Sequence, residues 1–148
     1  MGDFTASVFV TRSPQDVFDF LSDPANLSTW NSSFESAQWS SSGPSHVGST
    51  YRVVARMLGA GKQGTFEIVE WDPPGRYGYR SNQRVFPIER MQTVLTLDPE
   101  DGGTRVTMNG QFALVGVLRF AERPFARLAA KQDGDNLLAA KRLLEDGG

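Results

Sequence analysis

Glu89 is the residue of this sequence best suited to acid–base chemistry. Met91 and Thr93 follow it at intervals of two residues, and this alternation is typical of a β-strand whose side chains share one face. A carboxyl group on an apolar face, without a cation beside it, has a raised pKa and can act as a general acid or base. A position near the strand end equally allows a solvated carboxylate that pairs with Arg84 or Arg90.

Two tyrosines, Tyr51 and Tyr79, are the other candidates for a catalytic role. The alternation places both on the inward face of their strands, where a phenol can assist proton transfer. The chain has one histidine and no cysteine, and it contains no Ser-His-Asp, nucleotide-binding or phosphate-binding motif. We therefore expect no metal and no cofactor, and the sequence predicts no recognisable catalytic constellation.

Length and charge restrict the class of protein further. The chain has 148 residues and a formal net charge of -2, and its basic residues are scattered rather than clustered. We therefore expect one domain over residues 1–148 and no nucleic-acid partner. The sequence has no secretory leader pattern and no apolar stretch of about 18 residues. This predicts a cytoplasmic protein without an integral membrane segment.

The stretch from Arg123 to Glu145 is long enough and rich enough in alanine and leucine to form a helix of about six turns. Pro124 suits its first turn. A period of 3.6 residues predicts a buried face and an exposed face. The predicted buried face holds Phe125, Ala129, Ala140, Leu143 and Leu144, and the opposite face holds Arg127, Lys131, Gly134 and Lys141. The polar residues that interrupt the buried face either reach solvent or line a cavity, and they are Gln132, Asp133 and Asn136.

The rest of the chain predicts strands and two short helices. A strand is expected over Phe4–Val10, and Ser13-Pro14 and Asp23-Pro24 each predict a capped helix start. The second of these helices covers residues 24–29 and leads to Trp30. Six further strands follow, because apolar alternation resumes between turn residues. They are expected at Phe34–Ser40, Ser49–Leu58, Gly64–Asp72, Gly75–Asn82, Ile88–Asp98 and Thr104–Leu114.

Several short motifs, in this order, resemble those of one known superfamily. They are Val10-Thr11-Arg12-Ser13-Pro14, Val17-Phe18-Asp19-Phe20-Leu21, Asp23-Pro24 with Trp30, Val47-Gly48-Ser49, Glu70-Trp71-Asp72-Pro73-Pro74, Gly103-Thr104-Arg105-Val106 and Asn136-Leu137. The chain resembles the polyketide cyclase/dehydrase and lipid-transport (SRPBCC) superfamily, which includes START domains and the birch-pollen allergen. The resemblance implies an α+β helix-grip fold, in which a seven-stranded antiparallel sheet curves around the C-terminal helix and encloses a cavity.

The alternation of each strand indicates which side chains would face that cavity. The outward face would carry the arginines of the sheet, Arg52, Arg56, Arg76, Arg80, Arg90 and Arg105. The inward face would be aromatic, apolar or small, which fits a packed core as well as a cavity for an apolar ligand. The predicted ligand contacts are Trp30, Tyr51, Met57, Phe66, Tyr79, Met91, Thr93, Met108, Phe112, Phe125, Ala129 and Asn136.

Three functions stay open at this point. The first is binding of a hydrophobic small molecule such as a lipid, isoprenoid or polyketide, in a cavity between the sheet and the C-terminal helix. The second is a polyketide cyclase or aromatase-dehydratase acting on a poly-β-keto substrate, with Glu89 and Tyr51 or Tyr79 as acid–base groups. The third is a protein-interaction module, because Trp39 and Trp71, if they point outward, would form an exposed aromatic patch or a homodimer interface.

Overall fold

The computed structural model has an α+β architecture with one antiparallel sheet and one long helix. It describes residues 2–41, 46–57, 60–81 and 88–146, and the side chains of residues 56, 57 and 60–62 lie outside that description. The elements in chain order are β1 (Gly2–Val10), α1 (Pro14–Leu21), α2 (Pro24–Trp30), β2 (Phe34–Trp39), β3 (Thr50–Met57), β4 (Ala60–Asp72), β5 (Arg76–Ser81), β6 (Ile88–Glu100), β7 (Gly103–Leu114), the 3-10 helix η1 (Gly116–Ala121) and α3 (Glu122–Asp146).

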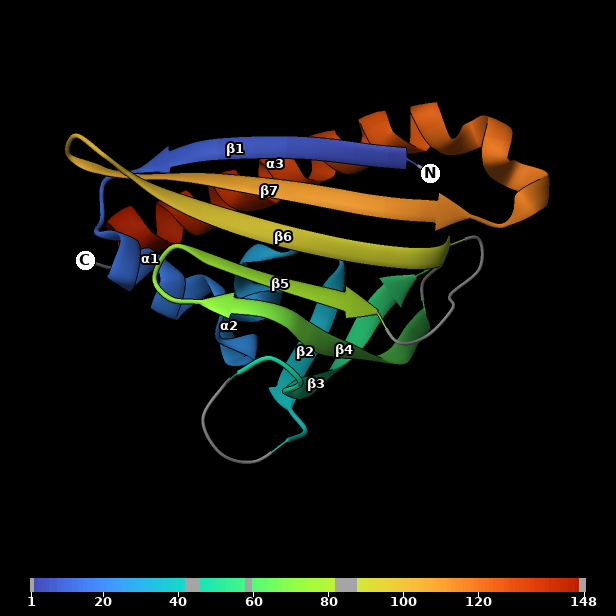
Figure 1. The fold of residues 1–148 in the computed structure, drawn as a ribbon, viewed down its shortest axis with the longest axis horizontal. Coiled ribbons are helices and arrows are strands. Elements are labelled where there is room, and N and C mark those ends of the chain that lie inside the picture. The colour runs from blue at the N-terminus through green and yellow to red at the C-terminus, as the bar shows by residue number, and fades with distance from the viewer. Residues whose placement is uncertain (1, 42–45, 58–59, 82–87, 147–148) are drawn as a thin grey trace.

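The sheet has seven strands in the order β1-β7-β6-β5-β4-β3-β2, and every neighbouring pair is antiparallel. In Figure 1, β2 and β3 cross the direction of β1, β7 and β6 at a steep angle, and β4 bends between the two directions, so the sheet curves. Helix α3 lies behind β1 and β7, and α1 and α2 lie at the end of the sheet where the chain terminates. The predicted helix-grip architecture is confirmed.

The two short helices begin at the predicted capping residues. The Ser13 side chain accepts a hydrogen bond from the Asp16 amide at 3.2 Å, and the Asp23 carboxylate accepts one from the Ala25 amide at 3.0 Å. Each helix has its proline in the first turn, where the missing N–H group costs nothing. These caps fix where α1 and α2 start, and hence where Trp30 enters the core.

The structure places most of the described side chains of the strands on the predicted inward or outward face, with Glu89 as an exception. Twelve expected inward residues are buried, namely Tyr51, Val53, Phe66, Ile68, Tyr77, Tyr79, Thr93, Leu95, Leu97, Val106, Met108 and Phe112. Arg52, Arg76, Arg80 and Arg90 are exposed, and Arg105 is partly exposed. The side chain of Arg56 lies outside the description.

Trp39 and Trp71 do not point outward, which was the condition for the exposed aromatic patch, and both pack against the core. A β-bulge between Ile68 and Glu70 shifts the register of β4, so that Trp71 pairs with Tyr77 and packs edge-on against Phe18 of α1 with ring centroids 5.1 Å apart. Trp39 is opposite Tyr51, and their ring centroids are 5.5 Å apart. Both indoles therefore pack against the inner aromatic face and form no exposed patch.

Helix α3 packs most tightly through its C-terminal half. Its buried residues are Asn136, Leu137, Ala140 and Leu144. Leu143 is 43% exposed, contrary to the prediction, because it lies to one side of the Leu137–Leu144 line of contact. No helix within the described ranges has the length and apolar character needed to cross a bilayer.

The C-terminal end of α3 is tied to the first strand and its following loop by a polar cluster. The Glu145 carboxylate accepts hydrogen bonds from the backbone amide and hydroxyl of Thr11, each at 2.9 Å. Lys141, predicted to face solvent, donates to the Phe9 carbonyl at 2.7 Å and to Glu145 at 2.9 Å. The hydrogen bonds from Thr11 and then from Lys141 lower the pKa of Glu145 to about 2.

Candidate ligand pocket

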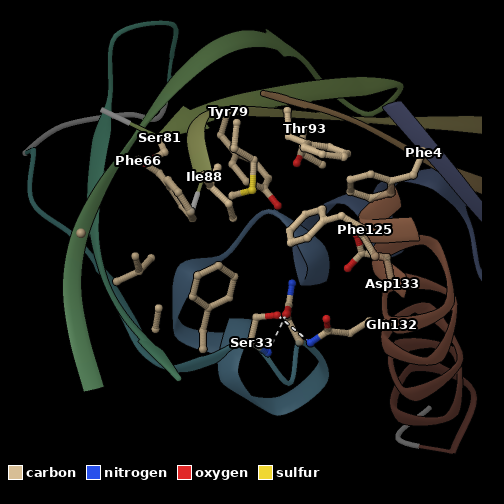
Figure 2. Close-up of a pocket in the computed structure, with 18 of the residues that line it drawn as sticks. Phe4, Ser33, Phe66, Tyr79, Ser81, Ile88, Thr93, Phe125, Gln132 and Asp133 are labelled. Atoms are coloured by element: carbon tan, nitrogen blue, oxygen red, sulfur yellow. Dashed lines mark hydrogen bonds between the residues drawn. The ribbon is translucent and has the colours of Figure 1, made fainter. Parts of the chain in front are cut away.

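A pocket of about 310 Å³ lies between the concave face of the sheet and the N-terminal half of α3. Figure 2 shows Phe66, Tyr79 and Ile88 pointing into it from the sheet, while Phe125 and Asp133 point into it from α3. Ser33, after α2, and Gln132 border the space on its polar side. The wall is thus mostly aromatic and aliphatic, with its polar groups gathered near the helix.

Two reciprocal Gly–Phe pairs build the wall at the β1–β7 edge. Phe4 lies opposite Gly110, and Gly2 lies opposite Phe112. A Cβ atom on either glycine would collide with the ring of the phenylalanine that covers it. The glycines therefore allow both rings to lie flat across the neighbouring strand. Phe112 in turn contacts Phe125 of α3 with ring centroids 4.8 Å apart, which closes the wall between the sheet and the helix.

The structure brings seven of the predicted ligand contacts to the pocket wall. They come from four strands and from α3, which the sequence separates widely, and they are Phe66, Tyr79, Met91, Thr93, Phe112, Phe125 and Ala129. Phe4, Phe34 and Ile88 also line the pocket and were not predicted. Phe4 had been assigned to a strand without a role, and its position opposite a glycine of a distant strand leaves no mark in a single sequence.

Four predicted contacts do not line the pocket. Trp30 is 3% exposed, and its indole nitrogen has no hydrogen-bond partner among the described residues. Tyr51 is buried between the rings of Trp39 and Phe66. Met108 is 1% exposed and lies opposite Ala6 and Leu95 in the solid part of the core. The side chain of Met57, a fifth predicted contact, lies outside the described residues.

Asn136, the fourth of these residues, connects α3 to the loop after α2. Its side-chain oxygen accepts hydrogen bonds from the amide and the hydroxyl of Ser32, each at 3.1 Å. Its side-chain nitrogen donates to Asn31 and to Asp133, each at 3.2 Å. Since both donors and both acceptor sites of the amide are used, Asn136 positions the wall and does not face a ligand.

The predicted position of Glu89 on the apolar face was wrong. A β-bulge between Ile88 and Arg90 interrupts the alternation of β6, so Ile88 faces the pocket in place of Glu89. A bulge inserts one extra residue and changes the face of the side chains beyond it. Glu89 is half-buried and is not part of the pocket wall.

The two candidate tyrosines are neutral phenols. Burial is the main cause that raises the pKa of Tyr51 above its ordinary value. Burial also raises the pKa of Tyr79, followed by the nearby Asp133 carboxylate, and a hydrogen bond with Thr93 opposes the shift. Tyr79 can therefore donate a hydrogen bond to a bound molecule but cannot act as a base near neutral pH.

Asp133 is the titratable side chain that the sequence reasoning did not select. It lines the pocket, where burial raises its pKa to about 6, and the hydrogen bond from Asn136 opposes part of that shift. The polar interruption of the helix face at Gln132, Asp133 and Asn136 was the signal that indicated it. Among the residues that the structure describes, no group of three or more histidine, cysteine, aspartate or glutamate side chains could hold a metal ion.

Comparison with known proteins agrees with this geometry. A family model described as polyketide cyclase / dehydrase and lipid transport matches residues 1–144. The uncharacterized protein Rv1546 of Mycobacterium tuberculosis (strain ATCC 25618 / H37Rv) is 29% identical over 124 residues, which cover 80% of this chain and 83% of that protein.

Two solved structures share the fold at low sequence identity. TTHA0849 from Thermus thermophilus has a TM-score of 0.79 and 18% identity, and the match covers 99% of both chains. The di-domain ARO/CYC BexL, from the BE-7585A biosynthetic pathway, has a TM-score of 0.79 and 17% identity, with 96% of this chain and 46% of that chain covered. The family match over nearly the whole chain and the shared architecture lead to one conclusion: the chain belongs to the polyketide cyclase/dehydrase and lipid-transport family.

Proposed function

We propose that the protein binds a hydrophobic small molecule, of lipid, isoprenoid or polyketide type, in the pocket between the sheet and α3. The observation that carries this proposal is the wall itself, in which phenylalanine and tyrosine rings surround about 310 Å³ of space. Burial of apolar ligand surface against such a wall is favourable by roughly 25 cal/mol per Å² before the cost of association.

The small side chain of Ala129 supports a binding role for the pocket, as opposed to an incidental gap in the core packing. It faces the pocket, whereas the C-terminal half of the same helix places Leu137 and Leu144 against the sheet. A helix that only covered a core would carry large apolar side chains along its whole buried face. The small side chain at Ala129 keeps open a space that a leucine would fill.

The test is to fill the pocket and measure ligand-dependent stability. The neutral probe 2-(1-naphthyl)ethanol is expected to raise the Tm of the unaltered protein, since a ligand at 100 times its Kd adds about 2.7 kcal/mol to the native state. Ala129→Leu should abolish this rise. Arg127→Leu, which introduces the same side chain at an exposed position of α3, is the matched control and should keep it. A rise of equal size in Ala129→Leu would contradict the proposal.

The second candidate function is that of a cyclase or aromatase-dehydratase, and one observation favours it. Asp133 faces the pocket with a pKa raised to about 6 by burial, which suits a group that exchanges protons near neutral pH. Tyr79 would act as a hydrogen-bond donor to a substrate carbonyl. Asp133→Asn should then lower turnover of a poly-β-keto substrate about 10²-fold or more. Glu89→Gln, outside the wall, should leave turnover unchanged.

The proposed interaction role has lost its basis, because Trp39 and Trp71 contact inner aromatic rings. A homodimer and a cytoplasmic location stay predictions from the sequence. Light scattering of the purified protein at several concentrations would measure the first, and fractionation of cells that express the full chain would measure the second.

A further inference from the structure

The described wall of the pocket carries one charged side chain, and that charge is negative. Asp133 is the one charged side chain among the described residues that line the pocket. Ion pairs among the described residues lie elsewhere, on the outer face of the sheet, at the start of α1 and at the C-terminal end of α3. Burial raises the pKa of Asp133, and the hydrogen bond from the Asn136 amide opposes part of that shift. Among the described wall residues, a single carboxylate thus faces a space lined by uncharged side chains.

The surroundings of this carboxylate are suited to a cation. Phe125 precedes Asp133 by about two helical turns and points into the same space, as Figure 2 shows. The rings of Phe112 and Phe125 adjoin each other, and Phe66 and Tyr79 face them from the sheet. Aromatic ring faces attract a cation by about 0.5–2 kcal/mol each, and the attraction increases when the cation is desolvated.

The carboxylate is held in place and keeps capacity for a ligand. Asn136 donates to Oδ1 of Asp133 at 3.2 Å, and the other three hydrogen bonds of that amide fix it to Asn31 and Ser32. A carboxylate accepts about four hydrogen bonds, and within the described part of the chain Asp133 accepts this one. The remaining lone pairs can accept a charge-assisted hydrogen bond, which is roughly twice as strong as a neutral one.

From this geometry we infer that the pocket selects a hydrophobic molecule that carries one basic amine, with Asp133 as the anchor of the ammonium group and the phenylalanine rings around its apolar body. The inference rests on the proposed binding function and specifies its ligand class. A neutral ligand would leave the carboxylate without a cationic partner, and an anionic ligand would add a like charge. Both arrangements are costly in a largely apolar site.

Three probes with the same ring and different charges test the inference. They are 2-(1-naphthyl)ethylamine, which is a cation at pH 7.5, the neutral 2-(1-naphthyl)ethanol, and the anion 1-naphthylacetate. Their dissociation constants are measured by calorimetry with the full chain at pH 7.5 and low salt. The amine is expected to bind about tenfold or more tighter than the alcohol, and the anion is expected to bind weakest.

Two matched variants separate the anchor from general charge effects. Asp133→Asn keeps the size of the side chain and an oxygen for Asn136, and it should abolish the preference for the amine while the alcohol binds at least as well as before. Asp135→Asn removes the same charge from an exposed position of α3 and should keep the preference. Thermal unfolding without ligand checks that each variant is folded.

The possible outcomes distinguish the two proposals. Equal binding of amine and alcohol to the unaltered protein, or a preference for the amine that persists in Asp133→Asn, would overturn the inference and leave the binding function supported. Absence of binding by all three probes would count against the binding function itself, and against this inference with it. Tightest binding by the anion would assign the pocket to an acidic ligand and overturn the inference.

Discussion

The two halves of helix α3 lie against the same sheet, but one half packs into the core and the other half lines the pocket. The C-terminal half presents Leu137, Ala140 and Leu144, each less than 10% exposed, to a core without space. The N-terminal half presents Phe125, Ala129 and Asp133 to the pocket. One continuous helix thus divides into a part that stabilises the fold and a part that leaves room for a ligand.

Two of the carboxylates of this helix, Glu145 and Asp133, have pKa values shifted in opposite directions. Glu145 accepts hydrogen bonds from Thr11 and Lys141, which lower its pKa to about 2. Asp133 lies against apolar surface, which raises its pKa to about 6. At neutral pH the first carboxylate stabilises the native state, whereas the second destabilises it until a partner arrives. The difference shows that the surroundings of a carboxylate, rather than its position on one helix, decide whether its charge stabilises the fold.

The largest expected effect is a loss of stability when a core contact in the C-terminal half of α3 is removed. Leu137→Ala removes a fully buried side chain, 0% exposed, and should lower the free energy of unfolding by about 2–5 kcal/mol through lost burial and a new cavity. Urea unfolding at pH 7 measures the change. Leu128→Ala, at a position that is 65% exposed, is the control and should change stability by about 0.5 kcal/mol or less. A small loss in Leu137→Ala would mean that the C-terminal half is not what stabilises the fold.

A smaller effect, an increase in the free energy of unfolding, is expected for a substitution in the N-terminal half of α3, which lines the pocket. The pKa of Asp133 rises from 3.8 in the unfolded chain to about 6 in the native state, so its favourable contribution is complete below pH 3.8 and is lost as pH rises through 6. Asp133→Asn should therefore raise stability at pH 8 by up to about 3 kcal/mol, reduced by the screening that water provides. At pH 3.5 the gain should be close to zero. Urea unfolding at the two pH values measures the difference, and an equal gain at both would contradict the assigned pKa.

The smallest effect concerns the polar cluster at the end of the helix. The pKa of Glu145 is lowered in the native state, so its stabilising contribution is present above the unfolded value of 4.5 and is lost as pH falls toward 2. Glu145→Gln should lower the Tm slightly at pH 7, and the difference from the unaltered protein should disappear at pH 2. Asp135→Asn serves as the control, because that side chain is exposed on the same helix. A Tm difference that stays constant over this pH range would mean that the carboxylate charge is not involved.

The fold could be predicted from the sequence because the patterns that indicate its helices and strands are local. The caps at Ser13 and Asp23 and the alternation along each strand depend on neighbours within a few residues, and the structure confirms them. The bulges near Ile68 and Glu89 were missed, as was the register shift near Phe34, because a bulge depends on the pairing partner and not on its own strand. This is why Glu89 was assigned to the wrong face and the face of Trp71 was left open.

The pocket was only partly accessible for a related reason. Its aromatic residues on the inward faces could be predicted from alternation, but the polar interruption of α3 left two interpretations open. Only the three-dimensional arrangement separates Asn136, which is saturated by Asn31, Ser32 and Asp133, from Asp133, which faces the pocket. Side chains three positions apart on one helix can differ completely in role.

The reciprocal Gly–Phe pairs between β1 and β7 set how far the pocket extends toward this edge of the sheet. Phe4 belongs to an edge strand, held by the sheet on one side only, and its ring occupies the place that a side chain at residue 110 would need. A smaller residue in place of Phe4 would lengthen the pocket, and a larger residue in place of Gly110 would push the ring aside. A single exchange in the first strand is therefore sufficient to shift the preferred ligand size while the remaining strands stay as they are.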